Sequence, residues 1–343
     1  MKVKTEKLEN GKVRLEATLT SKETEAALKE ARDAVIKQLD LQVDELHPVG
    51  TLAKEQYDID DFDAVVAVQM AESLLPAAID QTGIIPAFIP EAQQDQLPKT
   101  GHSYSFSFVV TPKPQFELSS YGPVTVEVEP VQITEDQVRQ VLIDIALRYC
   151  ESVDEIPSHS DYSDEWIEEH LPFESDLEDT KDTIREELSL TAKDKQRQAI
   201  RKAAAVELAK SFNGDIPTDI LEAARSSVLE DIRIGLAQQG IDIRDYFEGQ
   251  EDAMYAFADQ KAYSTLAQGY TLDAVFKHAE LILEDEDIDA WCMSVASRQD
   301  ASIVRKQMES AGQGFLMREG AQRLKAGNWL AAQATVIEKN AAS

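Results

Sequence analysis

The chain has 343 residues, of which 43% are hydrophobic and 29% are charged, a composition typical of a folded protein with room for two or three domains. It contains 34 lysine and arginine residues against 64 aspartate and glutamate residues, so its formal net charge is −30. A surface this acidic repels phosphate groups, which argues against nucleic acid and anionic membranes as partners, and it keeps exposed apolar surface in solution.

The two cysteines predict no disulfide. Cys150 and Cys292 lie far apart in the sequence and show no CxxC spacing, so we expect two reduced thiols. The first residues alternate between polar and apolar and lack the apolar core of a signal peptide. No stretch approaches the roughly 20 apolar residues that a membrane span needs. A cytoplasmic protein without membrane contact is the simplest expectation.

The first part of the chain mixes strand patterns with helix patterns. Strict alternation of apolar and polar residues favours strands, and apolar residues three and four positions apart favour helices. Asn-Gly between two alternating runs is typical of a hairpin turn. The patterns predict, in chain order, a β-hairpin over 3–19 with its turn at Asn10-Gly11, helices over 21–39 and 60–80, and a strand over 103–110.

Prolines punctuate the next region, at positions 112, 114, 123 and 130. Because proline cannot donate to a strand ladder and stiffens an extended chain, we expect residues 124–128 to be part of a semi-rigid connector and not of a core. Thr134 and Gln137 form a potential capping box, which predicts a helix that extends to about Tyr149.

The second half of the chain, from Ser163 to about Ala332, is a nearly strand-free series of amphipathic helix patterns. Asn213-Gly214 has the chemistry of a helix C-cap, and Ile216-Pro217 precedes a further long helix. A first helix is predicted to begin at Ser163. The further predicted helices cover 177–212, 217–240, 243–266, 272–283, 288–296, 300–311 and 315–324.

No catalytic or metal-binding motif is found. Adjacent residues on a helix point in different directions, so Glu168, Glu169 and His170 do not converge on one ion, and His159 and Asp161 belong to the same acidic region. The acidic run 284–287 has no glycine at the position that an EF-hand requires. The sequence contains no GxSxG, GxGxxG or P-loop motif, so we expect neither an enzyme nor a cofactor.

Several short motifs accompany this order of elements: Ile-Pro-Ala-Phe at 85–88, Pro-x-Phe-Glu-Leu at 114–118, Val-Glu-Val-Glu-Pro at 126–130, and Ile-Pro at 216–217 before a helix that ends in Gln-Gln-Gly-Ile at 238–241. In these motifs and in the order of its elements, the chain resembles trigger factor, the bacterial nascent-chain chaperone. The resemblance implies an elongated, multidomain, predominantly helical protein. Its parts would be an α+β N-terminal ribosome-binding-like domain over 1–114, a linker, helix and acidic loop over 115–162, and a large all-α C-terminal chaperone domain over 163–343.

Two departures from the family pattern limit what the resemblance implies. The family inserts a prolyl isomerase domain of the FKBP type before the helical domain, whereas only about a dozen residues separate the Tyr149 helix from Ser163 here. The family also docks on ribosomes through a Gly-Phe-Arg-x-Gly-Lys loop. The residues at the corresponding place are Asp44, Glu45, Leu46, His47 and Pro48. Carboxylates there oppose binding to ribosomal RNA.

Aromatic and methionine side chains in the helical half are the candidates for contact with unfolded chains. Most of them have the spacing of core residues, but a minority would line an exposed surface, because flat rings and flexible methionines suit promiscuous apolar binding. The candidate contact residues are Tyr246, Phe247, Met254, Phe257, Met308, Phe315 and Met317.

The sequence therefore predicts an ATP-independent chaperone that binds unfolded or nascent polypeptides in a helical cradle. A dedicated assembly protein for one folded partner is the first alternative, and a residual prolyl isomerase is the second. The sequence leaves open whether the protein forms a homodimer, which would bury exposed apolar surface, and whether it reaches the ribosome by another route.

Overall fold

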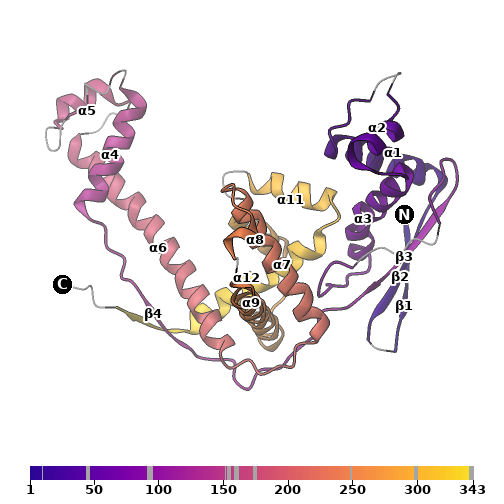
Figure 1. Cartoon of the computed structure of the whole chain (residues 1–343). Coiled ribbons are helices and arrows are strands. Elements are labelled where there is room, and N and C mark those ends of the chain that lie inside the picture. The colour runs from indigo at the N-terminus through magenta and orange to yellow at the C-terminus, as the bar shows by residue number, and fades with distance from the viewer. Residues whose placement is uncertain are drawn as a thin grey trace. The chain divides into compact units, whose positions relative to one another are not determined.

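The computed structural model describes residues 1–9, 11–43, 47–90, 96–150, 152, 156–157, 162–172, 176–247, 249–296 and 300–339. The elements in chain order (Figure 1) are β1 Lys2–Lys7, β2 Val13–Leu19, α1 Ser21–Gln38, α2 Val49–Tyr57, α3 Phe62–Asp80, β3 Tyr104–Val110, β4 Thr125–Val128, α4 Glu135–Tyr149, α5 Asp164–His170, α6 Leu177–Ala209, α7 Thr218–Ala237, α8 Ile243–Tyr246, α9 Glu251–His278, α10 Asp285–Val295, α11 Ala301–Ser310, α12 Gly314–Gln333 and β5 Thr335–Glu338. The predicted combination of a small α+β part with a larger helical part is confirmed.

The chain forms two compact units, and each is assembled from two separate stretches. Unit 1 contains Met1–Ser119 and Phe212–Ala326, and unit 2 contains Ser120–Ser211 and Gly327–Ser343. The three parts predicted from the sequence are each continuous, unlike these two units. They describe the domains of a family and not compact units, so the three-part division stays a prediction.

Unit 1 contains an antiparallel sheet in the order β1-β2-β3. Alternation along β2 and β3 turns one set of side chains inward, with Leu15 and Phe108 fully buried as register partners. Helices α1 and α3 pack against each other over this apolar face. The predicted pairing of the two hairpin strands and the predicted third strand are confirmed, whereas Asn10 of the predicted turn lies outside the described residues. Phe315 of α12 belongs to the same core, so a residue from the far end of the chain completes it.

Local caps define where the helices of this core begin. Thr20 is the N-cap of α1 and forms a capping box with Glu23, one residue before the predicted start. Asp61 caps α3. By length and composition α3 could cross a membrane, contrary to the expectation that no stretch is apolar enough. Its buried residues, which include Met70 and Ile79, fill the core of unit 1.

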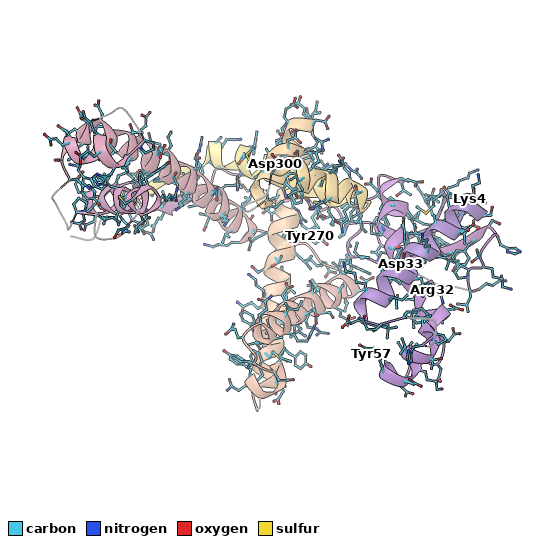
Figure 2. The ribbon with its side chains drawn as sticks, turned by 90° about the horizontal axis from the view of Figure 1, so that it is seen from above. Lys4, Arg32, Asp33, Tyr57, Tyr270 and Asp300 are labelled. Atoms are coloured by element: carbon cyan, nitrogen blue, oxygen red, sulfur yellow. The ribbon has the colours of Figure 1, made fainter. Side chains whose placement is uncertain are left out.

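Helix α2 was missed by the sequence patterns. It is short, it begins after the N-cap residue Pro48, and only Leu52 and Ala53 are buried, so its apolar period is weak. Tyr57 at its end (Figure 2) donates a hydrogen bond from its hydroxyl to the carbonyl oxygen of Leu39, at 2.7 Å.

Helices α7 and α9 pack against each other in unit 1. Small residues such as Ala258 and Ala262 are buried on α9. The predicted interruption between 266 and 272 was wrong, because α9 is continuous through Gly269. A Cβ at Gly269 would lie 2.5 Å from the guanidinium of Arg323, so this glycine permits close helix packing rather than a break. The chain turns instead at Gly249, which has a φ of +72°.

Unit 2 has its own small core between α4, α5 and α6. Val138 and Leu142 of α4 pack with Ile167 of α5 and Ile184 of α6. The predicted capping box of Thr134 and Gln137 is present. These helices therefore form a unit with local caps and an apolar centre.

The segment predicted as an open connector is in part a paired strand. β4 pairs in parallel with β5, in a register that places Val126 opposite Val336, and Val126 and Val128 are buried where α6 packs on β4. The expectation that 124–128 lies outside any core was therefore wrong. β5 also corrects the expectation of an all-α second half.

Candidate polypeptide-binding surfaces

A cluster of charged side chains joins the segment after β3 to the helices of unit 1. Lys113 Nζ lies 2.6 Å from Asp273 Oδ2 and also pairs with Glu319. Arg323 binds Asp273 with two nitrogens, at 3.0 and 3.2 Å, and its Nη1 lies 2.9 Å from Glu319 Oε1. We call these four residues, together with the Tyr270 ring 5.7 Å beneath Lys113 Nζ, the Lys113 cluster.

Burial shapes the electrostatics of this cluster. The Lys113 side chain is only 13% exposed. Burial raises the pKa of Tyr270 to about 12. Burial also opposes the charge of Arg323, but the carboxylates of Asp273 and Glu319 outweigh that effect and raise its pKa. These carboxylates neutralise two cations, so the cluster acts as a clamp and offers no unpaired acid or base for catalysis.

Aromatic rings extend the clamp along the same segment. The ring of Phe116 lies 4.9 Å from that of Tyr270 and 5.1 Å from that of Phe212, between centroids. Gly214 makes this possible, since a Cβ there would lie 2.4 Å from the Phe116 ring. The segment after β3 is therefore held on the helices by packing as well as by charge.

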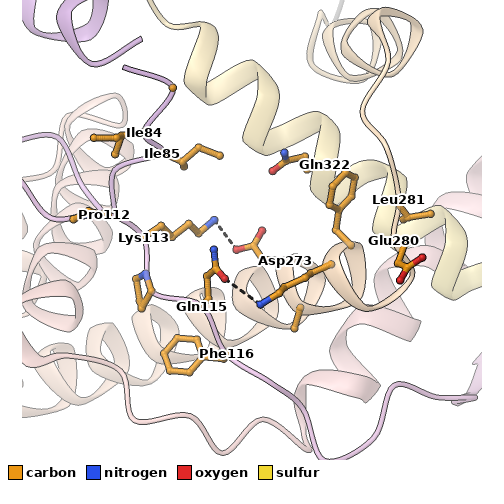
Figure 3. A pocket seen from close by; sticks show the side chains of 15 residues that line it. Ile84, Ile85, Pro112, Lys113, Gln115, Phe116, Asp273, Glu280, Leu281 and Gln322 are labelled. Carbon is orange, nitrogen blue, oxygen red and sulfur yellow. Dashed lines mark hydrogen bonds and ion pairs between the residues drawn. The ribbon is translucent and has the colours of Figure 1, made fainter. Parts of the chain in front are cut away.

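A groove of about 620 Å³ lies beside the clamp (Figure 3). Ile85 and Phe116 line it from the first stretch of unit 1, and Phe276 and Leu281 line it from the helical stretch. Lys277 donates to Gln115 across the groove at 3.2 Å. An apolar lining with a few polar groups can accept an extended apolar segment.

The helices α7, α8 and α9 expose large apolar side chains over residues 218–263, which we call the arm. Tyr246 and Phe257 are 57% and 56% exposed. Tyr255 and Phe257 are two positions apart on α9, so they point in directions roughly 200° apart. The other large apolar residues exposed on the arm are Ile234, Tyr255 and Tyr263. The arm thus presents dispersed apolar contacts on more than one side.

The predicted contact residues divide into three groups. Tyr246 and Phe257 are exposed, whereas Phe247, Met254 and Met308 are half-buried. Phe315 and Met317 are 1% and 3% exposed, and we withdraw both, because Phe315 fills the core of unit 1 and Met317 lies against Cys292. Other large apolar residues of the helical half are also exposed but were not among the predicted contacts, namely Ile234, Tyr255, Tyr263, Ile282, Met293 and Ile303.

Of the predicted ribosome-loop equivalent, Asp44, Glu45 and Leu46 lie outside the described residues. His47 and Pro48 are exposed and lead directly into α2. Lys54 of α2, the one lysine in residues 41–64, forms an ion pair with Asp60.

The metal candidates give no cluster in the described part of the chain. His159 and Asp161 lie outside it, and among the residues described no group of three or more histidine, cysteine or acidic side chains could hold a metal. His170 stacks on the Trp166 ring at 4.8 Å between centroids.

Two family models match the chain. The model described as "Bacterial trigger factor protein (TF)" matches residues 47–145, and that described as "Bacterial trigger factor protein (TF) C-terminus" matches residues 176–332. Together they cover well over half of the chain and leave residues 146–175 between them.

Individual trigger factors are similar at low identity. That of Desulforamulus reducens is 24% identical over 250 residues, which cover 69% of this chain and 57% of the relative. That of Natranaerobius thermophilus is 28% identical over 153 residues, which cover 43% of this chain and 33% of the relative. These matches thus span about a third to somewhat over half of the curated relatives.

A solved structure described as "Promiscuous Substrate Recognition in Folding and Assembly Activities of the Trigger Factor Chaperone" superposes with a TM-score of 0.42 and 11% identity, over 97% of this chain and 99% of that chain. The structural likeness is too low to assign a family. The assignment rests on the two family models, which match in the order of the N-terminal and C-terminal parts of one protein. The chain belongs to the trigger factor family.

Proposed function

We propose that this protein is an ATP-independent chaperone that holds unfolded polypeptides. The observation that carries the proposal, beside membership of the family, is the set of large apolar side chains exposed on the arm. Isolated exposed apolar residues are ordinary on any protein surface, but several aromatic rings on one helical element are typical of an interaction site.

The mechanism is holding by many weak contacts. Each exposed side chain of the arm offers a small apolar surface, and an unfolded chain that touches several of them is retained far longer than one contact allows. The apolar groove beside the Lys113 cluster supplies a further contact. The net charge of −30 opposes association between loaded complexes.

The activity we propose does not include prolyl isomerisation. Residues 146–175, between the two matched stretches, are too few to form an isomerase domain with its own core. We also propose that the protein works in the cytoplasm. Within it we expect the protein to act away from the ribosome, because residues 41–64 carry seven acidic residues and one lysine, which oppose contact with RNA phosphates.

The test is suppression of aggregation of chemically unfolded client proteins, measured by light scattering at stoichiometric ratio without ATP. We expect suppression for several unrelated clients. A variant with Tyr246→Ser, Tyr255→Ser and Phe257→Ser should need on the order of threefold more protein for the same effect, because three contacts are lost.

Leu97→Ser is the matched control, since Leu97 is similarly exposed, at 46%, but lies outside the arm. If the unmodified protein fails to suppress aggregation of any client, the holding function is refuted. A single saturable complex with one folded protein would support the assembly role instead.

A further inference from the structure

Strand β5 pairs with β4 but buries almost nothing. All four of its residues are exposed, including Val336 at 41% and Ile337 at 48%. β4 in contrast buries Val126 and Val128. Because apolar burial is the main stabilising term in folding, β4 is an integral part of unit 2, whereas β5 is attached to it by edge contacts.

The contacts that hold β5 recognise an extended backbone and one cation. The backbone N–H of Thr335 donates to the carbonyl of Val124 at 2.8 Å, and that of Lys339 donates to the carbonyl of Val128 at 2.9 Å. Lys339 Nζ lies 3.1 Å from Glu129 Oε1. Main-chain hydrogen bonds do not depend on side-chain identity, so other extended segments satisfy the same requirements.

β4 does not need β5 to stay in place. Helix α6 packs on β4, and Gln196 of this helix donates from its amide to the carbonyl of Glu129 at 3.0 Å. If β5 leaves, β4 keeps its position and presents a row of unpaired backbone donors and acceptors. Such an edge is a template for pairing with another chain.

We propose that the edge of β4 now paired with β5 is a binding site for one extended segment of an unfolded client, which displaces β5 and pairs in parallel with β4. This inference rests on the proposed holding function and names one of its contacts. The segment it takes contains β-branched or apolar residues followed by a lysine or arginine that pairs with Glu129, as in the Thr-Val-Ile-Glu-Lys sequence of residues 335–339.

The attachment of β5 makes the site selective for long chains. β5 follows α12 with only Ala334 between them, so its effective concentration at β4 is high and a short free peptide competes poorly. A long client that other surfaces of the protein already hold brings its own segments at a high effective concentration. Displacement therefore follows capture and adds a directional contact to it.

A reversible lock tests the proposal. Thr125 and Thr335 are exposed register partners, so Thr125→Cys with Thr335→Cys in a Cys150→Ser background allows a disulfide between β4 and β5. We expect the oxidised protein to need on the order of threefold more chaperone per client for the same suppression of aggregation, and reduction to restore it.

The matched control is Thr18→Cys with Ser105→Cys in the same background. These residues are also register partners, between β2 and β3, with Ser105 exposed, Thr18 half-buried and their hydroxyl oxygens 2.9 Å apart. Oxidation of the control should change nothing. Equal suppression by the oxidised and reduced β4–β5 variant would overturn the inference and leave the holding function intact, whereas failure of the unlocked protein would refute the function itself.

Hydrogen exchange of the unmodified protein gives a second measurement. On addition of a full-length unfolded client, we expect the amides of Thr335 and Lys339 to exchange on the order of tenfold faster, while β4 stays protected. Slower exchange in β5 would show that clients add outside the existing strand, and unchanged exchange would show that they do not reach it. Either result would overturn displacement.

Discussion

Lys113 Nζ lies 2.6 Å from Asp273 Oδ2, and this contact joins the segment that follows the sheet to the C-terminal part of helix α9. Lys113→Met roughly keeps the length of the side chain but removes its charge. The carboxylates of Asp273 and Glu319 then have Arg323 as the one cation left in the Lys113 cluster. Because the site is largely buried, we expect a loss of about 2 kcal/mol in the free energy of unfolding of unit 1, measured by urea titration.

Lys4→Met is the control for that substitution. Lys4 Nζ lies 3.6 Å from Glu16 Oε2 on the exposed face of the same sheet, and its side chain is 67% exposed. The free energy of unfolding should change by less than about 0.5 kcal/mol, as for most solvated ion pairs. A similar loss in both variants would mean that charge alone, and not the clamp, explains the effect.

Gly312 supports the contact between the helix α11–α12 turn and α3. It has a φ of +69°, and a Cβ there would lie 2.5 Å from the Cα of Ala77. We expect Gly312→Ala to destabilise unit 1 by about 3 kcal/mol, from the left-handed backbone and from overpacking together.

Gly240→Ala separates those two causes. Gly240 has a φ of +73°, but no atom lies within 4 Å of the place that a Cβ would take there. The substitution should cost about 1 kcal/mol, which is the backbone contribution alone. Equal costs at the two glycines, in thermal or urea unfolding, would show that α3 and the turn are not packed as described.

Tyr270 makes stability depend on alkaline pH. Burial raises the pKa of its phenol from 10.0 to about 12, so the folded state holds this proton more tightly than the unfolded state. The associated stabilisation is complete below about pH 10 and is lost as the pH rises towards 12.

Tyr270→Phe removes this dependence. The difference in the free energy of unfolding between the unmodified protein and the variant should therefore shrink as the pH rises from about 10 to about 12. Urea titrations at several pH values measure it. A constant difference across this range would place the phenol in a hydrated environment.

The acidic segment before α3 predicts weak binding to ribosomes. We expect the purified protein to stay in the supernatant when ribosomes are sedimented at low and at physiological salt, because carboxylates oppose contact with RNA phosphates. A variant that carries Gly-Phe-Arg-x-Gly-Lys in place of 44–50 should pellet, and more strongly at low salt. Sedimentation of the unmodified protein would contradict the charge argument.

Local signals in the sequence predicted most of the helices and the antiparallel sheet. The alternation in β2 and β3 identifies Leu15 and Phe108 as inward-facing residues, and the capping box of Thr134 and Gln137 marks the start of α4, because each depends on neighbours a few positions away.

Contacts between distant stretches were beyond these signals. Periodicity shows that Phe315 lies on an apolar face but not that the N-terminal core covers it, so it was predicted as a contact residue. The pairing of Val126 with Val336 was missed because β4 and β5 are each only four residues long and lie far apart in the sequence. The aromatic residues of the arm have core-like spacing, and only the structure separates Phe257, which is exposed, from Phe315.

The discontinuity of unit 1 has a consequence for the folding of this protein during its synthesis. A growing chain that has reached Ser211 contains all three strands of the sheet with α1 and α3, but it lacks Phe315 and both helices, α9 and α12, that clamp Lys113. The first stretch must wait, with part of its apolar core uncovered, until α12 leaves the exit tunnel. During its own synthesis this chain is thus the kind of incomplete polypeptide that we propose it protects.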